Sequence, residues 1–379
     1  MKSPWQTWNH SRPRAAVFSV SPFPSPRAHV GAIIGMTNAL QSHGYVTRLY
    51  AFFRTGAHET LVSQFGLHKS VGFGWSAKIP TRVGMLLSVV SWVLVAAVRS
   101  HDVILTRSPL IALAARRCDR VLLEIHQEPA NRLGRAKLDY WIIPLLRGKR
   151  YKFVYISRAI RTHYLKEFPS LSCARCVVAP SGFRRDWFPN SWSPSPRNRI
   201  VTYAGSLYQG RGIEVVLEVA RRIPDAVFRV IGGTSQAWVD LTSDIHVPGN
   251  CSHISHIAPT AIAGFLAESD VLLAPYQYKV LTASGDDIAG VISPLKLMEY
   301  FAAGRAVVAS DLPAIREIAE HSGNALLVPP KDVAAWTKAV EELLSNHTSR
   351  DRLSQRAFNS AHARLDWDSR LEAILRPSG

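Results

Sequence analysis

The residues best suited to chemistry lie close together between positions 293 and 299. Ser293 suits the N-cap of a helix and Pro294 its first position, which leaves the backbone N–H groups of the first turn free. Free N–H groups at a helix start attract anions, and Lys296 adds a full positive charge there. Glu299, one turn later, is placed to accept hydrogen bonds from ribose hydroxyls. This combination predicts a site for the phosphates and ribose of a nucleotide.

A second pattern of this kind is the segment YAGSLYQGRGIEVV, residues 203–216. A predicted strand enters a glycine-rich turn, and Arg211 stands just before the next helix. Glycine lets the backbone approach a bulky anion, and a guanidinium can bind two phosphate oxygens at once. A plain tight turn is the alternative interpretation of these glycines. Gly232 and Gly233 follow another predicted strand, and ligands of parallel sheets bind at the carboxyl ends of the strands. We therefore expect both loops at one edge of a sheet.

The elements that must position these residues alternate between strand and helix in both halves of the chain. Strands are predicted at 15–21, 103–106, 121–125, 153–156, 200–206, 226–233, 270–276 and 306–310, and helices at 212–223 and 294–304. Alternation of this kind predicts parallel sheets with helices on both faces. A chain of 379 residues is long enough for two such domains. We expect an α/β protein with two Rossmann-like domains.

The domain boundary is predicted where the composition changes to FPNSWSPSPRNR, at residues 188–199. The N-terminal domain then covers residues 1–190, and the C-terminal, nucleotide-binding domain covers residues 200–360. A closing helix within residues 361–379 is in a position to pack back on the N-terminal domain.

Positive charge is concentrated in the first half of the chain. Residues 1–200 hold 29 Lys+Arg and 8 Asp+Glu, a net charge of +21, whereas residues 201–379 have a net charge of −4. A basic half favours an anionic membrane surface or a nucleic acid as partner, unless arginine is simply frequent in this lineage. The apolar window 85–98 is too short to span a bilayer, which needs about 20 residues. It is either a buried helix or a helix lying in a membrane interface.

Composition excludes several classes of protein. With 47% hydrophobic and 19% charged residues, general disorder is excluded, and four cysteines do not make a disulfide framework. Cys173 and Cys176 form a single CxxC with no second ligand pair nearby, so no metal site is expected. The first residues lack the apolar run of a signal peptide, and we expect a cytoplasmic protein.

Together these segments resemble the retaining glycosyltransferase family 4, the "glycosyl transferases group 1", in its SPLK-type variant. The resemblance is carried by PFPSPR near the start, HQ after Ile125, the AGSLYQGRG loop and SPLKLMEYFAAGRAVVASDLPAIRE. It implies the GT-B fold, two Rossmann-like domains facing across a cleft. It also implies an enzyme that transfers a sugar from a nucleoside-diphosphate sugar to a hydroxyl with retained configuration, in polysaccharide or glycolipid assembly. No cofactor or metal is expected.

The resemblance also assigns roles to residues of this chain. Arg211 and Lys296 would hold the donor diphosphate, Glu299 the ribose, and His126 would lie beside the donor sugar; a core or loop histidine is the alternative interpretation of His126. The expected catalytic residues are His126, Arg211 and Lys296. The expected donor-binding set is Gly205, Ser206, Arg211, Gly232, Gly233, Ser293, Pro294, Leu295, Lys296 and Glu299. The acceptor side is expected to include Arg27, Gly31 and Arg107.

Two departures from the family pattern concern the donor. Ser206 stands where the family has an arginine, and Val291 stands where it has a glutamate that contacts the donor sugar. The resemblance therefore leaves the sugar undetermined, and Asp286 and Asp287 are candidate substitutes. The expected acceptor is lipid-linked or soluble, with the enzyme peripheral on the cytoplasmic face of a membrane and no nucleic acid as partner. The alternatives are a sugar-nucleotide epimerase, a basic nucleic-acid-binding protein and an inactive sugar-nucleotide-binding scaffold.

Overall fold

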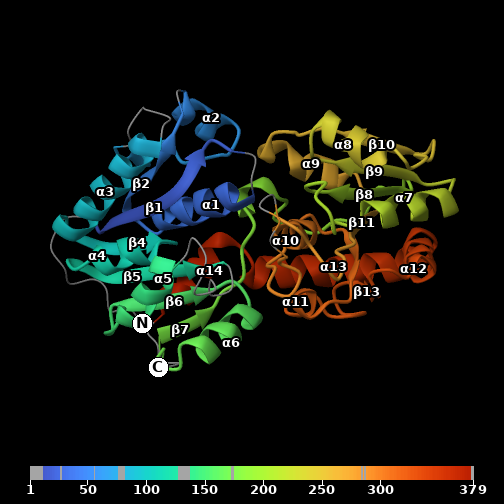
Figure 1. The fold of residues 1–379 in the computed structure, drawn as a ribbon. Coiled ribbons are helices and arrows are strands. Elements are labelled where there is room, and N and C mark those ends of the chain that lie inside the picture. Colours follow the sequence, from blue (N-terminus) through green and yellow to red (C-terminus); the bar gives the residue numbers. More distant parts are fainter. Residues whose placement is uncertain are drawn as a thin grey trace.

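The chain forms two parallel sheets, each covered by helices on both faces (Figure 1). The structure is a computed structural model, and it describes residues 12–25, 28–54, 56–75, 82–126, 137–171, 175–282, 285 and 287–376. The first sheet has the strand order β3-β2-β1-β4-β5-β6-β7, and the second has the order β10-β9-β8-β11-β12-β13. The expected pair of α/β domains is confirmed.

The first sheet has seven strands, and six helices of the N-terminal half connect or cover them. Its strands are β1 (Arg14–Phe23), β2 (Val46–Phe53), β3 (Gly72–Phe73), β4 (His101–Thr106), β5 (Cys118–Ile125), β6 (Tyr151–Tyr155) and β7 (Cys176–Val178). Its helices are α1 (Ala28–Ser42), α2 (Ala57–Ser63), α3 (Arg82–Val98), α4 (Pro109–Ala114), α5 (Lys137–Ile142) and α6 (Arg158–Glu167).

The second sheet follows the same plan. Its strands are β8 (Ile200–Ala204), β9 (Val227–Ile231), β10 (Cys251–Ile254), β11 (Val271–Ala274), β12 (Ala306–Ser310) and β13 (Leu326–Val328). The helices after β8 are α7 (Ile213–Arg222), α8 (Ser235–Thr242), α9 (Ile262–Ala267), α10 (Leu295–Ala302), α11 (Pro313–Arg316), α12 (Val333–Ser345), α13 (His347–Arg364) and α14 (Trp367–Leu375). Strands β8, β11 and β12 are buried along their whole length, as their continuous apolar sequences predict.

Strand order reverses once in each sheet, between β1 and β4 and between β8 and β11. In open α/β sheets, ligands bind outside the carboxyl ends of the strands at such a reversal. The loops after β8 and β11 thus frame one candidate site, and the loops after β1 and β4 frame a second region on the other domain.

The last helix of the chain belongs to the first domain. In Figure 1, α14 lies within the N-terminal half of the molecule, whereas α12 and α13 lie in the other half. Trp367, Leu371 and Ile374 pack in the same apolar cluster as residues of α1, and a side chain on Gly35 would overlap the Trp367 ring. The sequence predicted one helix from residue 361, but the chain breaks after Arg364. Asp366 caps the new helix by accepting a hydrogen bond from Ser369 N at 2.9 Å.

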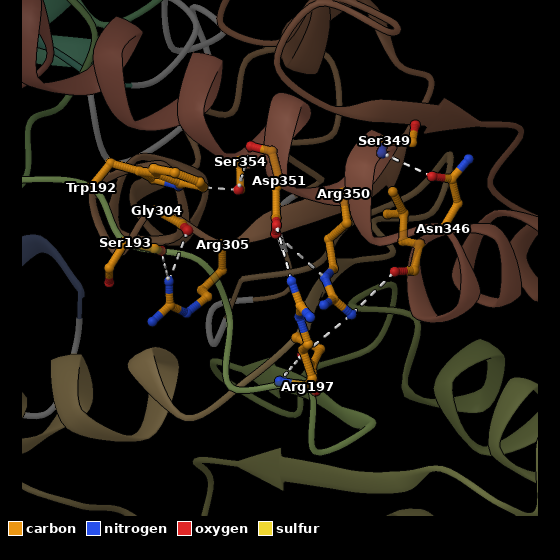
Figure 2. A network of polar contacts seen from close by, with 12 residues as sticks. Trp192, Ser193, Arg197, Gly304, Arg305, Asn346, Ser349, Arg350, Asp351 and Ser354 are labelled. Atoms are coloured by element: carbon orange, nitrogen blue, oxygen red, sulfur yellow. Dashed lines mark hydrogen bonds and ion pairs between the residues drawn. The ribbon is translucent and has the colours of Figure 1, made fainter.

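A buried polar network fixes the segment that leads into β8 (Figure 2). Arg350 of α13 lies 3.3 Å from Asp270, and the side chains are 1% and 0% exposed. Asp270 also accepts a hydrogen bond from Ile200 N at 3.0 Å. Arg305 donates to the carbonyl of Ser193 at 3.0 Å. These contacts hold the start of the second domain to its own core.

The apolar window 85–98 lies in α3 and is buried along one face only. Trp92 and Ala96 are fully buried, with the indole Nε1 of Trp92 donating to the carbonyl of Trp75. Six apolar side chains of the helix are instead exposed: Met85, Leu86, Leu87, Val90, Leu94 and Val98. The interpretation of this window as a buried helix is therefore wrong for one face of α3, which is exposed. None of the helices in the described ranges is long and apolar enough to cross a bilayer.

Candidate functional site

Two half-buried cations, each with a buried nitrogen atom, lie close together where the strand order of the second sheet reverses. Lys296 is the second residue of α10, and its Nζ lies 3.7 Å from the centre of the Tyr203 ring and 5.0 Å from that of Tyr276. Arg211 lies in the loop after β8, with its Cζ 5.4 Å from the centre of the same Tyr276 ring. Lys296 Nζ and Arg211 Nε are buried, and neither atom has a hydrogen-bond partner in the described part of the chain. Such atoms are costly unless a ligand supplies the missing acceptor.

The pKa shifts around these cations point to the same missing acceptor. Burial, together with the charge of Arg211, holds the pKa of Lys296 well below its usual value. Burial also raises the pKa of Glu299, in the next turn of α10, to about 7. An anion bound beside Lys296 would favour the ammonium form, because opposite charges stabilise each other's ionised state. The charge of Glu299 acts in the same direction as such an anion, since it raises the pKa of Lys296.

The glycines of the loop after β8 are required by close contacts. A Cβ on Gly205 would lie 2.6 Å from Lys296 Nζ, and a Cβ on Gly212, whose φ is 77°, would overlap the carbonyl of Pro275. Gly205 N donates to the carbonyl of Ile231, the last residue of β9, at 2.8 Å. This contact brings the Gly232-Gly233 loop, which follows β9, to the same edge. A plain tight turn would not need the backbone to come so close to Lys296 and Pro275.

Residues Ser293 to Leu295 do not form the cap that the sequence suggested. Helix α10 begins at Leu295 with Pro294 as its N-cap residue, and no side chain caps it. Ser293 Oγ instead accepts a hydrogen bond from Ser181 N at 3.0 Å, in the segment after β7. Ser293 thus bonds a distant part of the chain in place of the helix start that it would cap by local preference. The first-turn N–H groups of α10 have no side-chain cap.

Val291 does not face a sugar site in this structure. It is buried among apolar residues of the first domain, including Ile125 and Tyr155, and its carbonyl accepts a hydrogen bond from Ser157 Oγ at 3.3 Å. Asp287, one candidate substitute, accepts hydrogen bonds from two backbone N–H groups of its own loop, which lower the pKa of its carboxyl. Asp286 lies outside the described residues. Val291 therefore contributes to the contact between the two domains.

Ser206 and Tyr203 share a contact at the start of the loop after β8. The hydroxyl of Tyr203 donates to the carbonyl of Ser206 at 2.6 Å. Tyr203 thereby holds the turn and also presents its ring to Lys296. The sequence analysis did not assign a role to Tyr203 or to Tyr276, although their places at the ends of two buried strands were a usable signal.

A buried carboxylate organises the facing edge of the first sheet. Glu124, near the end of β5, is 4% exposed. Its Oε2 lies 3.1 Å from His126 Nε2 and accepts a hydrogen bond from Arg107 Nε at 3.3 Å. Its Oε1 accepts from Arg370 Nη1 of α14 at 2.6 Å. The sequence analysis missed Arg370, which lies 246 positions from Glu124.

Charge in this cluster fixes the form of the histidine. Burial opposes ionisation of Glu124, but the charge of Arg370, the hydrogen bond from His126 and the charge of Arg107 hold its pKa well below the usual value. Burial, followed by the charge of Arg107, lowers the pKa of His126 to about 4. At neutral pH, His126 is therefore uncharged and donates Nε2–H to the carboxylate, which leaves Nδ1 as an acceptor for a hydroxyl. One nitrogen of Arg107, Nη2, is buried without a partner among the described side chains and backbone groups.

The other expected acceptor residues are only partly described. Gly31 lies in the first turn of α1, and an added Cβ would meet no described atom within 4 Å. Arg27 lies outside the described residues. Cys176 contacts the Tyr155 hydroxyl at 3.8 Å, and Cys173, the other cysteine of the CxxC, lies outside the described ranges. Across the part of the chain that is described, no three His, Cys, Asp or Glu side chains gather in a way that could hold a metal ion.

The family match found by comparison with known proteins lies in the second domain. The family model described as "Glycosyl transferases group 1" matches residues 198–346. The chain is 27% identical over 184 residues to the phosphatidyl-myo-inositol mannosyltransferase of Mycolicibacterium smegmatis, covering 47% of this chain and 44% of that protein. It is 25% identical over 188 residues to the D-inositol 3-phosphate glycosyltransferase of Corynebacterium diphtheriae, covering 46% and 41%. Each match spans less than half the length of the relative.

A solved structure extends the comparison to both domains. The chain resembles Anabaena HepE in complex with UDP and glucose, with a TM-score of 0.69 and 15% identity, covering 95% of this chain and 97% of that one. At that identity the likeness concerns the fold alone. The expected GT-B architecture is confirmed.

Proposed function

We propose that this chain, whose residues 198–346 match the model of the group 1 glycosyl transferases, moves a sugar from a nucleoside-diphosphate sugar to a hydroxyl acceptor. The observation that carries the proposal is the buried pair of cations with missing acceptors, Lys296 Nζ and Arg211 Nε, at the strand-order reversal of the family-matched domain. A diphosphate has the charge and the oxygen atoms that these two groups lack.

The binding mode follows from the elements around the cations. Lys296 and Arg211 hold the diphosphate together with the first-turn amides of α10. Glu299 accepts hydrogen bonds from the ribose hydroxyls. Gly205, Gly232 and Gly233 leave room for the phosphates to approach the backbone. The donor would thus lie along the edge formed by the loops after β8, β9 and β11.

The transfer step needs no protein nucleophile. The bond between the sugar C1 and the donor phosphate oxygen breaks, and the acceptor oxygen bonds to C1 from the same face, so the configuration is retained. The acceptor proton passes to the departing phosphate, and the nucleoside diphosphate leaves. Lys296, Arg211 and the α10 amides stabilise the charge that develops on the leaving group. His126 Nδ1 orients a hydroxyl of the sugar.

We also propose that transfer requires no metal ion. The two cations and the helix amides already supply the positive field that a divalent ion would bring to the leaving diphosphate. Turnover that is unchanged in EDTA supports this assignment, and turnover that is abolished by EDTA and restored by one divalent ion contradicts it.

The acceptor is proposed to be lipid-linked, at the cytoplasmic face of an anionic membrane. The support is the net charge of +21 in the first 200 residues and the exposed apolar face of α3, on which Leu86 and Leu94 are 64% and 59% exposed. The wild type should sediment with vesicles containing phosphatidylglycerol, and the double variant Leu86→Ser/Leu94→Ser should not. Val239→Ser, an exposed apolar position of α8, is the control.

The direct test of the proposed function has two stages. Nucleoside-diphosphate sugars are screened for an increase in Tm, since a donor that binds only the folded state raises it. The stabilising donor is then incubated with candidate acceptors and also alone. Acceptor-dependent release of nucleoside diphosphate supports a transferase, whereas a new sugar nucleotide formed from donor alone would indicate an epimerase.

A further inference from the structure

A small, strongly basic pocket lies at the edge of the first sheet that faces away from the donor side. Its volume is about 170 Å³. Six cationic side chains line it: Arg120, Lys149, Arg150, Lys152, Arg175 and Arg376. The remaining lining residues are Leu122, Tyr151, Ile374 and Leu375, so none of the described residues that line the pocket is acidic.

The pocket is built from the starts of two strands and the end of α14. Arg120 lies near the start of β5, and Lys152 lies near the start of β6. His126 follows the other end of β5, and at about 3.3 Å per residue the two ends are roughly 20 Å apart. The pocket is therefore separate from the cluster around Glu124.

Several of these cations donate hydrogen bonds to neutral carbonyl groups. Arg120 Nη1 donates to the carbonyl of Leu375 at 2.8 Å, and Lys152 Nζ donates to that of Arg376 at 2.6 Å. Arg175 Nη1 donates to the carbonyl of Gly148 at 2.8 Å. A carbonyl satisfies a donor but does not cancel its charge. Burial and the charge of Arg120 accordingly lower the pKa of Lys152.

Two fully buried arginines elsewhere in the molecule are paired with carboxylates: Arg350 lies beside Asp270, and Arg370 beside Glu124. The cations of the basic pocket are half-buried or exposed, and six of them share one small concave surface whose described lining holds no carboxylate. Like charges in this arrangement repel one another, and a bound anion would relieve the repulsion.

We propose that this pocket is a second ligand site, which binds a phosphate-bearing anion. One water occupies about 30 Å³ of liquid, so the pocket has room for a hydrated phosphate group. It is too small for a sugar nucleotide, because pockets for ligands of that size span about 300–1,000 Å³. Lysine and arginine together suit phosphate, since the ammonium is a point charge and the guanidinium binds two oxygens.

The phosphate has two possible sources with the same chemistry, a free phosphate and a lipid headgroup. The pocket is linked to the exposed helix α3 by hydrogen bonds: Arg150 donates to the carbonyl of Arg116, and Arg117 Nη1 donates to that of Val98, the last residue of α3. The site does not depend on the transferase activity and can be tested without it.

The first arm of the test measures free phosphate. Inorganic phosphate is titrated calorimetrically into the full chain carrying Arg211→Ala/Lys296→Ala, so that the donor site does not contribute, at fixed ionic strength. Lys149→Gln, at an exposed position with no structural hydrogen bond in the described set, should weaken binding about fivefold, and adding Lys152→Gln should weaken it further. Lys338→Gln, in α12 of the other domain, should leave binding unchanged. Circular dichroism checks that each variant is folded.

The second arm measures lipid phosphate. Vesicles of neutral lipid are supplemented with phosphatidic acid or, at equal surface charge, with a carboxylate lipid. Stronger sedimentation with phosphatidic acid, lost in Lys149→Gln/Lys152→Gln but not in Lys338→Gln, assigns the pocket to a headgroup. Binding in the first arm alone assigns it to free phosphate. If folded pocket variants match the wild type in both arms, or if nothing binds in either arm, the proposal is wrong.

Discussion

The two domains differ in whether the cations at their facing sheet edges have a carboxylate as hydrogen-bond partner. Near the end of β5, three side chains that can carry positive charge gather around one carboxylate, so that Arg107, His126 and Arg370 all contact Glu124. At the start of α10, Lys296 Nζ and Arg211 Nε lie among tyrosine rings with no acceptor in the described residues. The first cluster contains a counter-charge for its cations, whereas Lys296 Nζ and Arg211 Nε have no hydrogen-bond acceptor in the described residues.

This difference separates a positioning role from a binding role. A cation that already has a carboxylate partner gains little from a ligand anion, whereas an unpaired buried cation gains both a hydrogen bond and a counter-charge. The cluster around Glu124 is thus suited to hold His126 in one tautomer. The pair Lys296 and Arg211 is suited to take the diphosphate. Each of the following changes tests one side of that distinction.

The largest effect is expected from Lys296→Ala. Removing a charge aimed at the leaving diphosphate should lower kcat/KM about 10²–10³-fold in a steady-state assay with saturating acceptor. The unfolding free energy should stay level or rise, because an uncompensated buried cation is removed. Lys279→Ala, an exposed lysine of the same domain, is the matched control. Wild-type turnover by Lys296→Ala would remove the basis of the phosphate assignment.

The next largest effect is expected from Glu124→Gln. This change leaves buried cations without their counter-charge and should cost about 3 kcal/mol of unfolding free energy, measured by urea denaturation. Glu268→Gln is the control, because Glu268 pairs with Arg229 on the surface at 2.7 Å and should contribute less than about 1 kcal/mol. Equal losses for the two variants would show that the buried cluster is not held by charge.

A smaller effect is expected from pH through Glu299. Its pKa of about 7 means that the carboxylate form of Glu299, which we propose accepts ribose hydroxyls, forms as the pH rises through 7 and is lost as the pH falls. Donor affinity should therefore increase roughly tenfold between pH 6 and pH 8. The Glu299→Gln variant should bind the donor more weakly than the wild type at pH 8. Its donor affinity should not increase between pH 6 and pH 8. A wild-type profile that is flat across this range contradicts the assignment.

The smallest effect is expected from Ser293→Ala. Ser293 Oγ accepts the hydrogen bond of Ser181 N across the domains, and its loss should cost about 1 kcal/mol. Ser243→Ala, at an exposed hydroxyl, is the control and should cost less. If both variants unfold at the same urea concentration as the wild type, Ser181 N finds water in place of the hydroxyl.

The closeness of Lys296, Glu299 and Arg211 could be predicted because its determinants are local. Lys296 and Glu299 lie one turn apart on one helix, and Arg211 follows a glycine-rich turn, so spacing and the strand-end rule bring them to one edge. Tyr276 completes this group from the end of β11. The fold was predictable for the same reason, since strand and helix alternate along the chain.

The rest depends on contacts between distant segments. Arg370 reaches Glu124 only because α14 returns to the first domain, and no periodicity of the sequence encodes that return. Ser293 has the residue type of a helix cap, but Ser181 N offers it a better partner. Val291 has the position of a sugar contact, but its apolar side chain packs into the first domain. Tertiary packing decided each of these cases against the local pattern.

The return of α14 to the first domain also sets the order of events during synthesis. The residues that complete that domain, Trp367 to Leu375, are made after the whole of the second domain. Until they leave the ribosome, the first domain lacks the Trp367 side of its core and the guanidinium that neutralises Glu124. The second domain has all its strands by then and can fold earlier. The part of the protein that is translated first is therefore the part that matures last.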